Sequence, residues 1–61
     1  MATFIKLEMV KSRTGLSKSS IYLMMKEGRF PQNIGIGKRA VAWVEYEIQQ
    51  WIDSRIQTRC I

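Results

Sequence analysis

The segment TGLSKSSIYLMMKEGRFP, residues 14–31, contains the start and end signals of a short helix. Ser17 suits the N-cap position, where its hydroxyl can accept a hydrogen bond from a free backbone N–H group. Leu16 can pack on Ile21 as a hydrophobic staple at the same end. Gly28 suits the far end, because glycine adopts the left-handed conformation that commonly follows a helix. The segment therefore predicts a helix between Ser17 and Gly28.

A second short helix is expected immediately before this segment, over residues 7–14. Leu7, Val10 and Thr14 recur there at helical spacing, and Gly15 is placed to end the helix. Two short helices separated by about three residues that include a glycine are typical of a helix-turn-helix.

The two sides of the helix after Ser17 differ in composition. At about 100° per residue, one side should belong to the core and carries Ile21, Met24 and Met25. The opposite side carries Ser19, Tyr22, Leu23 and Lys26. A solvated surface is the simplest explanation of that side, but an exposed tyrosine and leucine do not help solubility. Lys18 and Ser19 lie near the helix N-terminus, where backbone N–H groups and the helix dipole favour phosphate.

The stretch FPQNIGIGKRAVAW, residues 30–43, predicts a β-hairpin. Pro31 cannot continue a helix, and RAVAW has the branched and aromatic content of a strand. Val41 and Trp43 should lie on the same face of that strand. We expect the two strands over residues 32–36 and 39–43.

The turn of this hairpin is expected at Gly37 and Lys38, so that Lys38 and Arg39 lie at an exposed tip. Charged hairpin tips also occur for solubility alone. After a helix-turn-helix, however, a basic hairpin is typical of the wing of a winged helix. Such a wing can reach the DNA backbone or the minor groove.

The last segment, VEYEIQQWIDSRIQ, places one apolar stripe along a helix. The stripe consists of Val44, Ile48, Trp51, Ile52 and Ile56. Acidic residues come early and arginines late in this part of the chain, in agreement with the helix dipole. We expect this helix to supply the core. Burial of Trp51 should contribute on the order of 3 kcal/mol, so that its truncation unfolds the protein.

The net charge of +5 is unevenly distributed. Residues 1–39 hold eight Lys and Arg against two Glu, a net charge of +6, whereas residues 40–61 have a net charge of −1. This segregation favours a polyanionic partner, with nucleic acid as the first candidate and an anionic membrane surface as the second.

Length and composition argue against several classes of protein. A chain of 61 residues buries only about 60% of its unfolded surface, which leaves little room for a deep catalytic cleft. With no histidine and only Cys60, one copy can build neither a disulfide framework nor a cysteine and histidine metal site. No apolar run approaches the roughly 20 residues of a membrane span, and a secretory signal is lacking. We expect a cytoplasmic, nucleoid-associated protein that does not bind membranes.

Four blocks of this sequence resemble, in the same order, the AlpA family of short phage and prophage regulators. They are TGLSKSSIY, MKEGRFP, IGKRAVAW and EIQQWIDSR, and the resemblance covers residues 7–55. It implies a MerR-like winged-helix protein of a bacterial prophage or mobile element. Such a protein regulates transcription, often of an integrase gene, or acts as an excisionase that bends DNA.

The resemblance also implies roles for individual positions. It places Ser17, Lys18, Ser19, Ser20 and Tyr22 on the recognition helix, and Lys38 and Arg39 on the wing. The other matching positions are interpreted as structural: Gly15, Leu16, Ile21, Gly28, Phe30, Pro31, Val41, Trp43, Ile48 and Trp51. Leu23 departs from the family, which most often has arginine there, so a contact with a thymine methyl group can replace a polar one. Met9 and Arg13 also differ from the usual residues.

Taken together, the sequence predicts one domain over residues 1–61, of the α+β class: a small winged helix-turn-helix with three helices and a two-stranded hairpin wing. The expected function is sequence-specific binding of double-stranded DNA by a prophage or mobile-element transcriptional regulator. The second helix would enter the major groove, and the wing would contact the backbone or minor groove. The expected contact residues are Ser17, Lys18, Ser19, Ser20, Tyr22, Leu23, Lys26, Lys38 and Arg39. No catalytic residue, cofactor or metal ion is expected.

Alternatives and partners follow from the small size. A module of this kind buries roughly 600–1,000 Å² on DNA, so we expect cooperative self-association or a partner such as an integrase or RNA polymerase. The residues do not separate a regulator from an excisionase. A protein-interaction adaptor would instead use Tyr46, Gln50 and the C-terminal sequence QTRCI. A small enzyme is disfavoured, because no histidine is present and the carboxylates are scattered.

Overall fold

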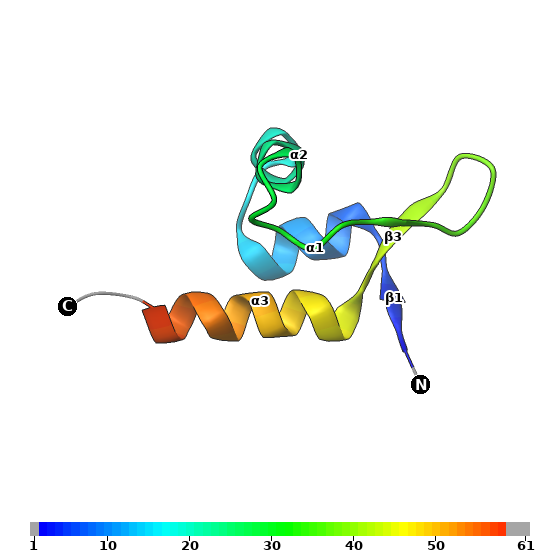
Figure 1. Ribbon diagram of the computed structural model, residues 1–61. Coiled ribbons are helices and arrows are strands. Elements are labelled where there is room, and N and C mark those ends of the chain that lie inside the picture. The colour runs from blue at the N-terminus through cyan, green and yellow to red at the C-terminus, as the bar shows by residue number, and fades with distance from the viewer. Residues whose placement is uncertain (1, 59–61) are drawn as a thin grey trace.

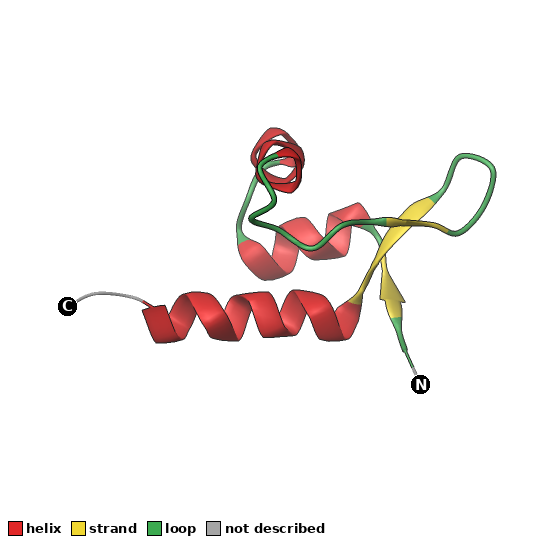
Figure 2. Ribbon diagram, in the orientation of Figure 1, coloured by secondary structure: helices red, strands yellow, loops and turns green. Residues whose placement is uncertain are grey.

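Three helices and three short strands make up the computed structural model, which describes residues 2–58 (Figures 1 and 2). Their order is β1 (Phe4–Ile5), α1 (Leu7–Thr14), α2 (Lys18–Lys26), β2 (Ile34–Gly35), β3 (Val41–Val44) and α3 (Glu45–Thr58). In Figure 1, α1 lies between α2 and α3, and the β2–β3 hairpin extends to one side. The predicted α+β fold class is confirmed, and the arrangement is consistent with a winged helix-turn-helix.

The two short helices have the predicted end signals. Gly15 follows α1 with φ of 73°, and its N–H donates to the carbonyl of Lys11 at 2.8 Å. After α2, Gly28 has φ of 76° and donates to the carbonyl of Met25 at 3.1 Å. A side chain would be strained at either backbone conformation, so both glycines end their helices for the reason predicted.

The sheet has three strands and not the two predicted from the sequence. All pairs are antiparallel, in the order β1-β3-β2, with Ile5 opposite Trp43 and Ile34 opposite Ala42. The N–H of Glu45 also donates to the carbonyl of Thr3 at 2.7 Å. Two residues of β1 are too few to show an alternating pattern, but they satisfy backbone groups along an edge of β3.

The hairpin strands are shorter than predicted. Residues before β2 are held elsewhere, because the carbonyl of Pro31 accepts a bond from Trp43 Nε1 at 3.1 Å and Gln32 Nε2 donates to the carbonyl of Met25 at 2.9 Å. Val44 is the last residue of β3. The prediction that it belongs to the last helix is therefore wrong. The turn is also longer than predicted, with the N–H of Ile36 donating to the carbonyl of Ala40 at 2.9 Å.

The core lies between the sheet and the three helices, and Trp43, fully buried, is its largest member. Its other members are Ile5, Val10, Ile21, Met25, Phe30 and Ile48. The expectation that the last helix supplies the core is only partly right, since Trp51 and Ile52 are half-buried and Ile56 is 51% exposed. The physical reason is that the last turns of α3 extend past α1 and α2 (Figure 1).

Val41 is likewise 38% exposed, although it shares a strand face with buried Trp43. It lies at the end of β3 nearest the hairpin turn, which extends away from the helices (Figure 2). Predicted features at Arg59 and Cys60 lie outside the described residues. No helix within residues 2–58 is both long enough and apolar enough to cross a membrane.

Candidate nucleic-acid interface

The start of α2 is fixed by its own serines. Ser17 has extended backbone angles, and its Oγ accepts a hydrogen bond from the N–H of Ser20 at 3.2 Å. The same hydroxyl donates to Ser20 Oγ at 3.1 Å. The predicted N-cap is therefore confirmed, and it leaves the side chains of Lys18 and Ser19 exposed on the first turn.

The side of α2 that faces away from the core is the outer face of α2, consisting of Ser19, Tyr22, Leu23 and Lys26. All four side chains are exposed, and Leu23 is 55% exposed. On the opposite side, Ile21 and Met25 are buried and Met24 packs against the core. The structure therefore confirms the prediction from helical spacing of which residues of α2 face the core and which face solvent.

Tyr22 connects the outer face of α2 to the sheet. Its ring meets the Trp43 ring edge-on, with centroids 6.2 Å apart and planes at 67°. Edge-to-face contacts of this kind are favourable and fix the orientation of an aromatic ring. Tyr22 is 36% exposed, so part of the ring remains available for a ligand.

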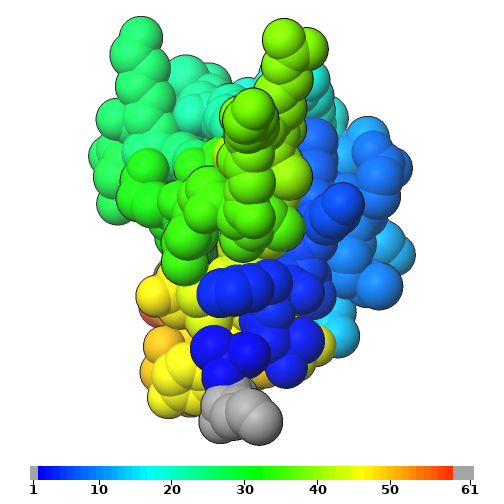
Figure 3. Space-filling model, turned by 90° about the vertical axis from the view of Figure 1, so that its right-hand side faces the viewer, coloured from blue at the N-terminus to red at the C-terminus, as the bar shows by residue number. Residues whose placement is uncertain are grey.

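The hairpin turn, residues 36–40, lies on the same side of the molecule as α2. Lys38 and Arg39 are both exposed and both lie within the turn, because the bond between Ile36 and Ala40 encloses them. In Figure 1, α2 and the turn lie above α1, whereas α3 lies below it. Seen from the hairpin side, atoms from around the end of α2 and atoms of the turn project from the same end of the molecule (Figure 3).

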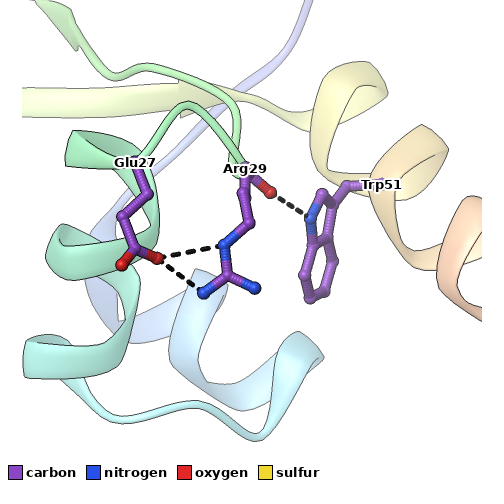
Figure 4. Close-up of polar contacts among 3 residues, drawn as sticks. All are labelled: Glu27, Arg29 and Trp51. Atoms are coloured by element: carbon purple, nitrogen blue, oxygen red, sulfur yellow. Dashed lines mark hydrogen bonds and ion pairs between the residues drawn. The ribbon is translucent and has the colours of Figure 1, made fainter.

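Two tryptophans hold the segment between α2 and β2 in place. Trp43 Nε1 donates to the carbonyl of Pro31 at 3.1 Å, and Trp51 Nε1 donates to the carbonyl of Arg29 at 2.9 Å (Figure 4). Phe30, between the two acceptors, packs edge-on against Trp51 with centroids 4.9 Å apart. These bonds tie the segment to β3 and to α3, which sets the hairpin at a fixed position relative to α2.

The cationic side chains divide into paired and unpaired groups. Three form ion pairs, at 3.7, 2.7 and 2.6 Å: Lys11 with Glu8, Arg13 with Glu45, and Arg29 with Glu27. Within the described chain, six form none: Lys6, Lys18, Lys26, Lys38, Arg39 and Arg55. The four cations expected to contact DNA from α2 and the hairpin turn all belong to this second group, as far as the described residues show. Over residues 2–58, no cluster of three or more His, Cys, Asp or Glu could hold a metal ion.

Lys6 is an additional cation near the hairpin that sequence reasoning did not assign to the site. It precedes α1 and lines a pocket together with Leu7, Glu8, Arg39, Ala40 and Val41. Lys6 belongs to the basic part of the sequence, residues 1–39. Nothing in the sequence indicates that it lies near Arg39, because 33 positions separate the two residues. Only the pairing of β1 with β3 brings the two residues together, so no local pattern could have revealed this proximity.

Comparison with known proteins agrees with this architecture. Residues 3–56 match the family model described as Prophage CP4-57 regulatory protein (AlpA). The chain belongs to the AlpA family. The resemblance stated from four sequence blocks is thus confirmed, and the family is one of regulatory proteins and not of enzymes.

The chain is also similar to two known proteins. One is the uncharacterized protein ORF88 of Enterobacteria phage P4, 36% identical over 56 residues, which cover 92% of this chain and 64% of the phage protein. The other is the DNA-binding transcriptional activator AlpA of Escherichia coli strain K12, 28% identical over 57 residues, with 84% of this chain and 81% of the activator covered. The chain thus spans less than two thirds of the phage protein.

Proposed function

We propose that this AlpA-family chain is a single winged helix-turn-helix domain, residues 1–61, that binds double-stranded DNA sequence-specifically in the bacterial cytoplasm. As a regulator of a prophage or mobile element, it would insert α2 into the major groove. The hairpin would act as a wing on the adjacent backbone or minor groove. The name of the Escherichia coli relative, a DNA-binding transcriptional activator, supports this function.

The main support for the proposal is that two cationic surfaces, without ion pairs among residues 2–58, lie on one side of the molecule. α2 and the hairpin turn lie on the same side of α1 (Figure 1), and atoms from around the end of α2 project beside those of the turn (Figure 3). Tyr22 on α2 also contacts Trp43 on β3. A rigid pair of projections can contact a groove and its flanking phosphates at the same time. This arrangement explains the basic excess in residues 1–39 as a surface that meets a polyanion.

Each part of the surface has a proposed task. Lys18, Ser19 and the capping serines Ser17 and Ser20 would hold phosphates at the N-terminus of α2, where backbone N–H groups point outward. Tyr22, Leu23 and Lys26 would meet base edges, with Leu23 against a thymine methyl group. Lys38 and Arg39 would contact the backbone or minor groove.

The test is a titration of the whole chain against duplex DNA. A binding site is selected from a random duplex library, and gel shifts compare it with a scrambled duplex at two salt concentrations. We expect tighter binding to the selected site than to the scrambled duplex. The slope of log affinity against log salt concentration should be about −5, as for five or six neutralised phosphates.

Alanine at Tyr22, Lys26 and Arg39 together should abolish this binding, while circular dichroism shows that the helices persist. Lys11→Ala is the matched control, because Lys11 pairs with Glu8 on α1 and lies outside the proposed surface. Binding that is independent of salt, or no binding to any duplex, would contradict the proposal.

The same surface could serve an excisionase, and DNA bending separates the two functions. An architectural factor must deform its duplex, whereas a transcriptional regulator need not. The exposed Leu23 is compatible with an apolar wedge between base steps as well as with a thymine contact. A circular-permutation gel shift on the selected site measures the bend. In either role, the small interface favours neighbouring copies, an integrase or RNA polymerase as a co-binder.

The adaptor alternative rests on the exposed side of α3. Tyr46 is 66% exposed, and its hydroxyl accepts a bond from Gln50 Nε2 at 2.8 Å. If this surface were the functional one, alanine at Tyr46 and Gln50 would abolish activity in cells. The substitutions at Tyr22, Lys26 and Arg39 would then be silent.

A further inference from the structure

A second surface lies on the side of α2 away from its outer face. It is a groove of about 590 Å³ between the α1–α2 connection and the second half of α3. Met24 lines it from α2, and two residues along a helix place Met24 about 160° around the axis from both Tyr22 and Lys26. The groove and the outer face of α2 therefore point in nearly opposite directions. We call it the arginine groove, after the residues described below.

The floor of the arginine groove is apolar and incompletely covered. Leu16 and Met24 line one wall, and Trp51, Ile52 and Ile56 line the other. Ile56 is 51% exposed, and the last turns of α3 run past α1 and α2 (Figure 1). No other described segment covers this part of α3, so the apolar stripe of the helix continues beyond the core into solvent.

Among residues 2–58, three arginines and no acidic residue line the same groove: Arg13, Arg29 and Arg55. Arg13 and Arg29 each use a carboxylate from outside the groove, Glu45 and Glu27. Figure 4 shows the guanidinium of Arg29 directed to Glu27, while its carbonyl accepts the bond from Trp51. Arg55 lies over the Trp51 ring, 5.8 Å from its centroid, with no ion pair among the described residues.

We propose that the arginine groove binds an acidic segment of a partner protein, with apolar side chains against Leu16, Met24 and Ile56 and a carboxylate on Arg55. Charge complementarity decides the sign of the partner, because the described lining holds no acidic residue and its Arg55 forms no ion pair among residues 2–58. The apolar floor decides its class. A nucleic-acid backbone would satisfy the arginines but would place phosphates against Ile56 and Leu16, whereas an amphipathic peptide satisfies both.

This inference goes beyond the DNA-binding function and does not depend on it. Since the groove and the outer face of α2 point apart, one copy can hold a duplex and an acidic segment at once. A regulator built in this way could bring a partner protein to its DNA site without any change in its own fold.

The test uses a fluorescein-labelled amphipathic peptide of leucine and glutamate at helical spacing, with a glutamine-for-glutamate version as its control. Fluorescence anisotropy measures binding to the whole chain without DNA. We expect the acidic peptide to bind and the glutamine version to bind at least about fivefold more weakly. In ¹⁵N-correlation spectra, amides of Leu16, Ile52 and Ile56 should shift, and those of Ser19 and Lys38 should not.

Two variants that each remove one positive charge distinguish the arginine groove from the proposed DNA surface. Arg55→Gln should weaken peptide binding about fivefold and leave DNA binding unchanged, whereas Arg39→Gln should do the reverse. Ile56→Ser, at another exposed position, should also weaken the peptide. Equal binding of the two peptides, a peptide affinity that follows Arg39 in place of Arg55, or no binding would overturn the inference. Loss of DNA binding in Arg55→Gln would assign the groove to the nucleic-acid surface and would overturn it as well.

Discussion

On the side formed by the outer face of α2 and the hairpin turn, cationic side chains have no acidic partners among residues 2–58. On the side formed by the second half of α3, two arginines are paired with glutamates and the third lies over a tryptophan. The first side has unpaired charge with a few separate apolar residues, and the second has a continuous apolar strip with arginines along it. The comparison teaches that a net charge of +5 says little until the internal ion pairs are known.

The two tryptophans show a parallel difference. Each donates an indole hydrogen bond to a carbonyl in the segment between α2 and β2. Trp43 is fully buried and contacts Tyr22 on the outer face of α2, whereas Trp51 is half-buried and borders the arginine groove. Trp43 thus belongs to the scaffold of the proposed DNA surface, and Trp51 to the opposite side.

The largest expected effect comes from removing Trp43. Trp43→Ala should cost about 3–5 kcal/mol of unfolding free energy, comparable to the whole stability of so small a domain, because it leaves a cavity beneath α2 and the hairpin. Trp51→Ala should cost less, about 1–3 kcal/mol, since Trp51 packs at the edge of the core and is only partly buried. Urea unfolding followed by circular dichroism measures both. Equal losses would show that the two sides depend on one undivided core.

A smaller effect, on binding and not on stability, is expected from the hairpin turn. Lys38→Gln combined with Arg39→Gln should reduce the salt slope of DNA binding by about two, because two phosphate contacts are lost. Both side chains are exposed and unpaired, so the unfolding free energy should change by less than about 0.5 kcal/mol. An unchanged slope would mean that the turn does not reach the duplex.

The smallest expected effect on DNA binding comes from two serines at the N-terminus of α2, the N-cap Ser17 and the first-turn Ser19. Ser17→Ala should lower stability by about 1 kcal/mol, because the N–H of Ser20 loses its acceptor. Ser19→Ala removes the same hydroxyl from an exposed position and should change stability by less than about 0.5 kcal/mol while weakening DNA binding. Thermal unfolding and gel shifts on the same two proteins test this. If Ser19→Ala were the more destabilising, the assignment of cap and contact residues would be reversed.

Much of the helix-turn-helix could be predicted because its signals are local. The bounds of α1, the cap at Ser17, the turns at Gly15 and Gly28, and the two sides of α2 all depend on residues within one or two helical turns. Backbone sterics and helical spacing act at that range, so the sequence carries the information directly.

The sheet and the last helix were predicted less well. The sequence analysis did not predict β1, predicted hairpin strands that are longer than those found, and predicted that Ile56 is part of the core. Each of these features depends on a contact with a distant segment. β1 requires the free edge of β3, the start of β2 depends on what Trp43 and Gln32 bind, and burial along α3 depends on where α1 and α2 end.

The family, the helix-turn-helix and the excess of positive charge can be recognised without a structure, because motif order, capping and composition are properties of the chain. Three other features are visible only in the folded chain: the ion pairs among residues 2–58, the proximity of Lys6 to Arg39, and the deeper burial of Trp43 than of Trp51. Ion pairing and burial depend on distances between residues far apart in sequence. Those distances are fixed only when the helices and the sheet pack together.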